Sequence, residues 1–550
     1  MIVNKSMYPL QNSFGVISKM QDKFASLQMQ LGTGEKSSTL AGMGRDLPLS
    51  LSVRSRLDKI EGYSANIETV NLRLSFLDKT LTRFGKLEGE ARNAAVQGQY
   101  GTGGINMATL PGLSKARFDE IVTMLNEDVA GRYLFGGTVT DKAPLPESET
   151  LLNGANGKNG YADVVSLRRS ADGVDDFDPT NDVLPGRLTS TANETVPGQL
   201  RLSEDGLHPF GFKLSTVSTT ASTAAVSVTQ PPSGDVVGGI SITFNAQPSP
   251  GDTISVGLTL PDGTETQVKL TATTEVPPPA GSFLIGPTAS DTANSLNAAL
   301  GVSLDQSAKT ELRAASTFAA ATDFFDAEGK PKIPNTVAGG KPTALVDGSA
   351  TTVQWYRGGT VPEGDNPRMT VSSNIDDTSK VNYGMQANES GFLRLVRSQA
   401  ALAVSEYKSE TTVRSGFEQQ RLDAMALPEG ELRTDALAQY EADVTEAYRL
   451  ETGFFDGMAK RQQSELSESH NTEMGSIEII TMEIGLAQGT LQSATTRHTD
   501  YKAQLDNLLS DIETVSKEDV AMEILALQTR LQASFQTTAM VSQLSLVNFL

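Results

Sequence analysis

The stretch that decides the fold, residues 60–84, is IEGYSANIETVNLRLSFLDKTLTRF. Its apolar and aromatic residues recur in alternating steps of three and four, at Ile60, Tyr63, Ile67, Val70, Leu74, Leu77, Leu81 and Phe84. This 3.5-residue repeat is typical of a helix that packs along one narrow stripe against another long helix. At about 1.5 Å per residue, the helix would be about 37 Å long.

A longer repeat of the same kind lies near the other end of the chain. Its positions are Ile477, Ile480, Ile484, Ala487, Leu491, Ala494, His498, Tyr501, Leu505, Leu508, Ile512 and Val515. A helix of roughly 58 Å with so narrow a stripe needs a second long helix beside it. We interpret His498, a polar residue within the stripe, as one that sets the register of pairing.

Both chain ends continue the pattern. Residues seven apart, from Leu10 to Leu31, predict a first helix that stops near Gly32 and Gly34. The last segment is also rich in apolar residues, which are Val520, Ile524, Leu527, Leu531, Phe535, Leu544, Leu546, Val547, Phe549 and Leu550. Because chain ends fray unless they are docked, we expect this segment to pack on the N-terminal helix or on a neighbouring subunit. An intramolecular helical bundle with no role in assembly fits the same periodicity.

The middle of the chain, from about Pro144 to about Tyr383, has no heptads. Short alternating runs replace them at residues 239–246, 252–260, 267–274 and 353–357, separated by Pro-rich and Gly-rich turns. These runs predict antiparallel strands. Residues 288–300 and 308–325 predict helices within this region, and helical character returns after about Asn388.

The sequence therefore predicts an α+β protein in which both chain ends form a long antiparallel coiled-coil rod. We expect an N-terminal helical part at 1–145. An inserted β-rich outer part follows at 146–384, with a possible nested module near 215–330. A C-terminal helical part at 385–550 pairs with the first.

Composition and motifs argue against several classes of function. The 550 residues include 66 acidic and 45 basic ones, and the net charge of −21 disfavours a nucleic-acid partner. The absence of cysteine excludes thiolate chemistry, and the three histidines lack metal-ligand spacing. No apolar run is long enough to span a membrane, and residues 1–10 do not resemble a secretory signal. Nucleotide-binding, metalloprotease and serine-hydrolase motifs are missing, so we expect neither an enzyme nor a bound cofactor or metal.

One acidic stretch could bind a hard cation through its carboxylates, at Asp172, Asp175, Asp176, Asp178 and Asp182. It lacks the central glycine and the terminal glutamate of a calcium-binding loop. A solvated loop is the favoured interpretation.

The chain ends resemble the flagellin family of bacterial axial filament proteins. The strongest match is 519–550, with Asp519, Ala521 and Glu523 followed by LQASF at 531–535 and SQLSL at 542–546. Residues 31–36, LGTGEK, are similar to the turn after the first helix of that family. Residues 133–138, YLFGGT, favour the subunits that join the hook to the filament, and flagellin itself is the alternative.

The resemblance implies a structural protein that leaves the cell through the flagellar export channel without a cleaved signal. It implies an extracellular position on the flagellum, with the terminal helices in the inner layers and the insert facing outward. The implied partners are the first hook-associated protein on the hook side, flagellin on the filament side, identical subunits in a ring, and a flagellar export chaperone in the cytoplasm. An adhesive insert and an enzyme grafted onto the insert remain alternatives.

We expect the assembly contacts to involve the apolar stripe positions of both chain ends. These are Leu10, Ile17, Phe24, Leu31, Ile60, Ile67, Leu74, Leu81, Ile484, Leu491, Leu505, Ile512, Leu527, Leu531, Leu544, Leu546, Phe549 and Leu550.

Overall fold

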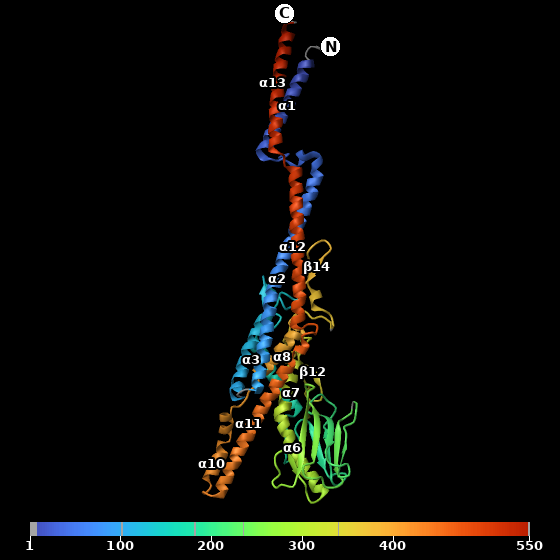
Figure 1. Ribbon diagram of the computed structural model, residues 1–550, viewed down its shortest axis with the longest axis vertical. Helices are drawn as coiled ribbons and strands as arrows, with labels where there is room; N and C mark the ends of the chain where they lie inside the picture. The colour runs from blue at the N-terminus through green and yellow to red at the C-terminus, as the bar shows by residue number, and fades with distance from the viewer. Residues whose placement is uncertain are drawn as a thin grey trace. The chain divides into compact units, whose positions relative to one another are not determined.

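The computed structural model describes residues 8–100, 103–180, 183–234, 236–338, 340–362 and 364–547. It confirms the predicted α+β class: long terminal helices pack together, and a β-rich region is inserted between them (Figure 1). The chain divides into two compact units. The first unit comprises Met1–Leu72, Ser373–Val381 and Ala487–Leu550, and the second comprises Arg73–Ser372 and Asn382–Leu486.

The first unit is built from two pairs of antiparallel helices. One pair is α1 (Tyr8–Thr33) with α13 (Lys517–Val547), which lie side by side in Figure 1. The other pair is formed by parts of α2 (Leu47–Tyr100) and α12 (Ile477–Glu513), helices that each contribute to both units. The 3₁₀ segment η1 (Leu40–Asp46) precedes α2. As predicted, the first helix ends directly before Gly34, whose φ of 77° suits a residue without a Cβ.

The β-rich part of the second unit contains two four-stranded sheets. The antiparallel sheet has the order β3 (Leu188–Ala192), β4 (Gln199–Glu204), β7 (Gly239–Phe244), β6 (Val226–Thr229). The mixed sheet has the order β10 (Ser282–Leu284), β9 (Glu265–Thr273), β8 (Thr253–Thr259), β5 (Lys213–Thr219), with β10 parallel to β9. Strands β7, β8 and β9 confirm the predictions for 239–246, 252–260 and 267–274.

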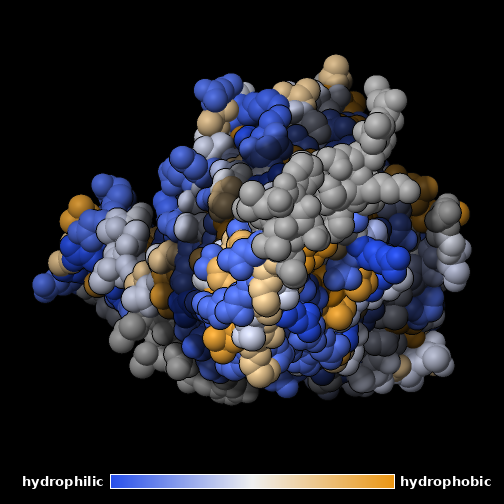
Figure 2. All heavy atoms as spheres, turned by 90° about the horizontal axis from the view of Figure 1, so that it is seen from above, coloured by the Kyte–Doolittle hydropathy of each residue, from blue (hydrophilic) through white to orange (hydrophobic). Residues whose placement is uncertain are grey.

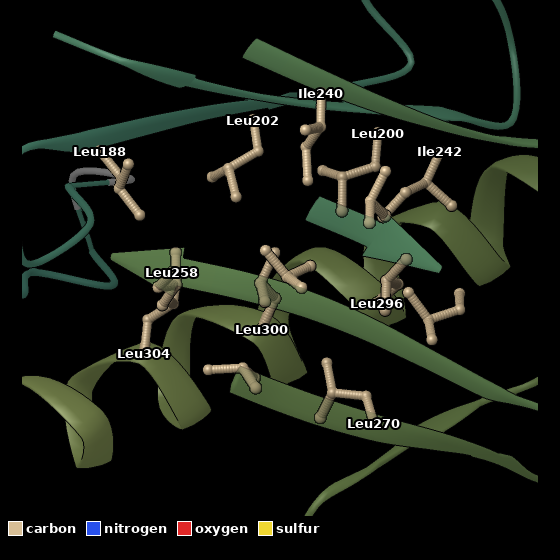
Figure 3. Close-up of a cluster of buried hydrophobic side chains, with 14 of the residues drawn as sticks. Leu188, Leu200, Leu202, Ile240, Ile242, Leu258, Leu270, Leu296, Leu300 and Leu304 are labelled. Atoms are coloured by element: carbon tan, nitrogen blue, oxygen red, sulfur yellow. The ribbon is translucent and has the colours of Figure 1, made fainter. Parts of the chain in front are cut away.

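Helix α6 (Ala289–Ser307) completes the core of this region. Alternate residues of β7 and β8 are buried, as expected for strands with one face on a core. Leu200 and Ile242 from one sheet point toward Leu258 of the other and toward Leu296 and Leu300 of α6 (Figure 3). Thr288 and Asp291 form a capping box that begins the helix. The two sheets and α6 therefore bury one shared core.

The rest of the second unit is mainly helical. Its helices are α3 (Gly103–Leu125), α4 (Ser148–Asn153), α5 (Tyr161–Asp172), the π-helical turn η2 (Ala308–Leu312), α7 (Arg313–Phe324), η3 (Pro367–Thr370), α8 (Ser390–Ala403), α9 (Glu410–Gly416), α10 (Glu418–Ala426), α11 (Glu431–Glu465) and η4 (Glu468–His470). Three short strand pairs are β1 (Asp128–Val129) with β2 (Arg132–Tyr133), β11 (Lys332–Pro334) with β12 (Leu345–Asp347), and β13 (Ser372–Asn374) with β14 (Lys380–Asn382). A second core joins residues of α3, α7, α8 and α11.

Two local expectations are wrong. Residues 353–357 form an irregular segment rather than a strand, and Trp355 and Tyr356 bury their rings in an aromatic core. Asp172 belongs to no solvated loop, because it ends α5, is 0% exposed and forms an ion pair with Arg168. Of the other residues in that acidic stretch, Asp182 lies outside the described residues.

Candidate assembly surfaces

The first candidate surface is the stripe between α1 and α13. Its buried members are Ile17, Leu27, Val520, Leu527 and Leu531, and half-buried residues, including Phe24 and Leu31, pack beside them. Lys23 forms an ion pair with Glu523 across the two helices. Each helix buries one narrow stripe against the other, as the heptad spacing requires.

The second candidate surface is the stripe between α2 and α12. In the first unit it buries Val53, Leu57, Ile60, Leu505 and Ile512 in one cluster. The stripe positions Ile67 and Leu491 are also buried, at 3% and 1% exposure. In the second unit, the stripe positions Leu74, Leu81 and Ile484 are at most 1% exposed.

Two positions of the predicted α12 stripe differ from the expectation. Leu508 is 42% exposed, and Leu509 packs in the cluster instead. Tyr501 is 41% exposed, and its hydroxyl accepts a hydrogen bond of 3.1 Å from Arg56. Steps of three and four both lead from Leu505 to Ile512, so the spacing alone could not choose between Leu508 and Leu509.

A backbone joint connects the two helix pairs within the first unit. The Lys36 amide donates to the Glu513 carbonyl at 2.7 Å, and the Val515 amide donates to the Gly34 carbonyl at 2.9 Å. The Glu513 carboxylate accepts hydrogen bonds from Arg54 at 2.6 and 2.9 Å, which hold the pKa of Glu513 below its usual range. The segment that follows α1 and the segment between α12 and α13 are therefore joined by backbone hydrogen bonds.

Apolar side chains also lie on the outside of the α1/α13 pair. The exposed ones are Phe14, Val16, Met29, Met522, Leu525, Phe535, Met540 and Val541. At about 100° per residue, Met522, Leu525 and Met540 project from the side of α13 opposite its buried stripe. Figure 2 views the molecule from above and shows hydrophobic residues, in orange, scattered among hydrophilic ones, in blue, on that face.

The C-terminal half of α13 is unusual for a helix with a solvent-facing side. From Leu531 to Val547 it contains no charged residue. A solvated helix normally carries charged residues opposite its apolar stripe. The composition of this segment and the exposed apolar side chains of α13 together make this helix a candidate interaction surface.

The remaining predicted positions lie outside the described side chains. The backbones of Leu10, Leu544 and Leu546 belong to α1 and α13, and Phe549 and Leu550 follow the last described residue.

Sequence reasoning missed one contact, between the α2/α12 pair and residues 373–381. Ile375 in this loop is 0% exposed, and its carbonyl accepts a hydrogen bond from His498 of α12. The polar stripe residue His498 was the only sequence signal that pointed to this place.

The grouping of charged side chains among the described residues bears on metal binding. No three of their histidine, aspartate or glutamate side chains are grouped as a metal site requires. Several buried ions of the second unit form ion pairs, as Arg168 does with Asp172 and Asp323. Among the helices described, none is long and apolar enough to cross a membrane.

Comparison with known proteins finds no family model that matches the chain and no curated protein that is similar to it.

Proposed function

We propose that this chain is a structural subunit of the bacterial flagellum, of the kind that joins the hook to the filament (hook-associated protein 3), and that it is not an enzyme. The proposal draws on the resemblance of residues 519–550 and 133–138 to the flagellin family. The observation that carries it is the α1/α13 pair, which buries one stripe and leaves apolar residues on its outer side.

The physical argument concerns water. Exposed apolar residues such as Met522 and Leu525 gain free energy when a neighbouring surface covers them, by about 25 cal/mol for each Å² removed from water. The uncharged half of α13 can enter such an interface without the cost of removing charges from water. Identical subunits packed side by side would cover these surfaces in every copy.

The proposed partners follow from this role. They are the first hook-associated protein on the hook side, flagellin on the filament side, identical subunits within a ring, and an export chaperone before secretion. We propose neither nucleic acid nor a membrane as a partner. The proposed location is extracellular, after passage through the flagellar export channel without a cleaved signal.

Deleting the gene in the source bacterium tests this role. We expect hooks without filaments and flagellin monomers in the medium. Filaments of normal length in the deletion strain would contradict the junction role. The alternative, flagellin itself, is separated by immunogold labelling, which should mark only the hook–filament boundary for a junction subunit and the whole filament for flagellin.

A pair of substitutions in α13 tests the surface itself. Leu525 is 63% exposed and Leu527 is 7% exposed, although they lie only two positions apart. Leu525→Asp should leave the helix content of the monomer unchanged and reduce its incorporation into flagella, because a charge then enters the covered face. Leu527→Asp should reduce both, because it places the charge in the stripe.

Leu525→Met is the matched control, since it keeps an apolar side chain of similar size. Circular dichroism measures the helix content, and complementation of the deletion strain measures incorporation. Normal assembly of the Leu525→Asp protein would show that the outer face of α13 makes no contact in the flagellum.

A further inference from the structure

The loop of residues 373–381 lies across both helices of the α2/α12 pair in the first unit. Short strands β13 and β14, which pair with each other, form its two ends. Its Ile375 side chain is fully buried, although the residues around it in the loop are mostly polar. A loop residue buried to this degree contributes to packing as a core residue does.

On the α2 side, Asp377 is the contact residue. Its carboxylate accepts a hydrogen bond of 2.7 Å from the Tyr63 hydroxyl and forms an ion pair with Lys59. These contacts lower the pKa of Asp377, with the hydrogen bond from Lys59 as the largest cause. Asp377 is therefore ionised when it binds α2 at neutral pH.

On the α12 side, two successive residues contact the loop. His498 Nε2 lies 2.6 Å from the Ile375 carbonyl oxygen, so the ring must carry a hydrogen on Nε2 because a carbonyl can only accept. Arg497 lies 3.5 Å from the carboxylate of Asp376. The loop thus contacts defined residues on each of the two helices.

The two stripe residues that the loop contacts also contact each other. The rings of Tyr63 and His498 stack with their centroids 5.9 Å apart and an interplanar angle of 18°. Tyr63 lies between Ile60 and Ile67 in the α2 stripe, and His498 follows Leu491 and Ala494 in the α12 stripe. Only one alignment of the two helices brings these rings together.

An apolar heptad stripe does not by itself fix the alignment of two long helices. A shift by seven residues again places apolar side chains opposite apolar side chains, as it does in coiled coils whose register is set by a polar residue. The same shift displaces a helix by about 10 Å, at 1.5 Å per residue. His498 and Arg497 would then lie far from Ile375 and Asp376, while Lys59 and Tyr63 could stay in contact with the loop.

We propose that loop 373–381 is a register lock, which selects one alignment of α2 and α12 by binding Lys59 and Tyr63 on one helix and Arg497 and His498 on the other. The loop is itself preformed, because Asp376 Oδ1 accepts hydrogen bonds from the amides of Thr378 at 2.8 Å and Ser379 at 2.6 Å. A preformed loop loses little conformational entropy when it binds. The lock concerns the fold of the chain and does not depend on the proposed function.

The absence of native cysteine allows a direct test in the full chain. Lys502→Cys is combined with Glu61→Cys, which reports the native alignment because these side chains form an ion pair of 2.6 Å. Lys502→Cys with Arg54→Cys or Glu68→Cys reports shifts of one heptad in either direction. A short bis-maleimide cross-links whichever pair is close, and the yield is measured on denaturing gels.

With the native loop, only the 61/502 pair should cross-link. His498→Leu together with Ile375→Gly should raise the yield of the 54/502 or 68/502 pair at least about tenfold, since the loss of a hydrogen bond and a buried side chain changes an equilibrium by that order. Tyr501→Leu is the matched control, because it changes a neighbouring α12 position outside the loop contact and should leave the pattern unchanged.

Two results would overturn the lock. In the first, the double variant still cross-links only at 61/502, which means that the apolar stripes alone set the alignment. In the second, the double variant keeps its helix content by circular dichroism but cross-links at none of the three pairs, which means that the loop holds the helices together without choosing their alignment. Asp377→Ala, which leaves α12 unchanged, repeats the test if the double variant does not fold.

Discussion

The β-rich region and the α1/α13 pair bury apolar residues in different ways. In the β-rich region, two sheets and α6 enclose a core whose members, such as Leu200 and Leu296, are fully buried. In the α1/α13 pair, one stripe is buried while Met522 and Leu525 on the other side of α13 stay exposed. The first region encloses its apolar residues within one chain, and the second leaves part of its apolar surface exposed.

The difference follows from geometry. A sheet has two faces and places alternate residues on each, so a strand such as β8 can be apolar inside and polar outside. A helix that pairs with a single partner buries only the stripe that faces it. Apolar residues elsewhere on α13 therefore have no place to be buried within the pair. We therefore expect the β-rich region to be stable within a single chain. We expect the terminal helices to gain stability from neighbouring molecules.

The largest expected effect concerns the β-rich region, whose core is enclosed within one chain. Leu296→Ala removes a side chain of α6 that is 0% exposed (Figure 3) and leaves a cavity where this helix packs on the sheets. We expect the free energy of unfolding of this region to fall by about 2–5 kcal/mol. Urea denaturation followed by the fluorescence of Trp355, the single tryptophan, which is buried in the same unit, measures the change.

The control for this cavity lies on the same helix. Val302 is 51% exposed, so Val302→Ala should change the free energy of unfolding by less than about 0.5 kcal/mol. A loss of similar size in both variants would show that the burial of Leu296 does not decide its contribution, since alanine favours the helix at either position.

An intermediate effect concerns pH and the ring of His208. Its Nδ1 accepts the Phe210 amide at 3.2 Å and its Nε2 bonds to Asp205, so the neutral ring fits the site. Burial lowers the pKa of His208 below the ordinary 6.5, and Arg187 and Lys213 lower it further, against the opposing effect of Asp205. The unfolded chain then binds the proton more readily than the folded one. Stability is therefore full above about pH 6.5 and falls as the pH drops below it.

The measurement is urea denaturation at pH 7 and at pH 5. His208→Gln keeps a donor and an acceptor in the side chain but cannot titrate. Its free energy of unfolding should fall less between the two pH values than that of the unaltered chain. Equal losses in both proteins would mean that groups other than His208 cause the pH dependence. Burial raises the pKa of Asp172 and Asp323, so these two carboxyls oppose a loss of stability at low pH.

The regular parts of the fold could be predicted because their signal is local. A 3.5-residue repeat is visible within a single helix, so the stripe positions Ile60, Leu74 and Leu491 follow from the sequence, and the structure buries them. The choice between Leu508 and Leu509 is not local, because both fit the spacing and only the partner helix decides.

The irregular parts could not be predicted because their signals come from distant segments. Asp172 seemed part of a solvated acidic loop, yet its carboxylate accepts hydrogen bonds from Ser316 and from the Gly211 amide, residues far away in sequence. Loop 373–381 shows no periodicity, and its contact with His498 appears only when the helices are in place. Both cases depend on long-range hydrogen bonds, which leave no local pattern in the chain.

The smallest expected effect concerns the α2/α12 pair of the first unit. Arg54 and Glu513 join α2 to the end of α12 through two hydrogen bonds, yet the Arg54 side chain is 51% exposed. Exposed ion pairs contribute little, because water and salt screen them. Arg54→Ala should therefore lower the free energy of unfolding of the first unit by at most about 1 kcal/mol. Far-UV circular dichroism during urea denaturation, at low and high salt, checks this value.

Glu513→Gln provides the second arm of this test, since it removes the charge and keeps an oxygen for Ser50. If the apolar stripe holds the pair, both variants should lose little at low salt and almost nothing at high salt, where the ion pair is already screened. If the free energy of unfolding falls by several kcal/mol even at high salt, the contacts of Glu513, rather than the apolar stripe, hold α2 and α12 together. The terminal helices would then resemble the β-rich region, with a fixed structure of their own, and the contrast between the two regions would fail.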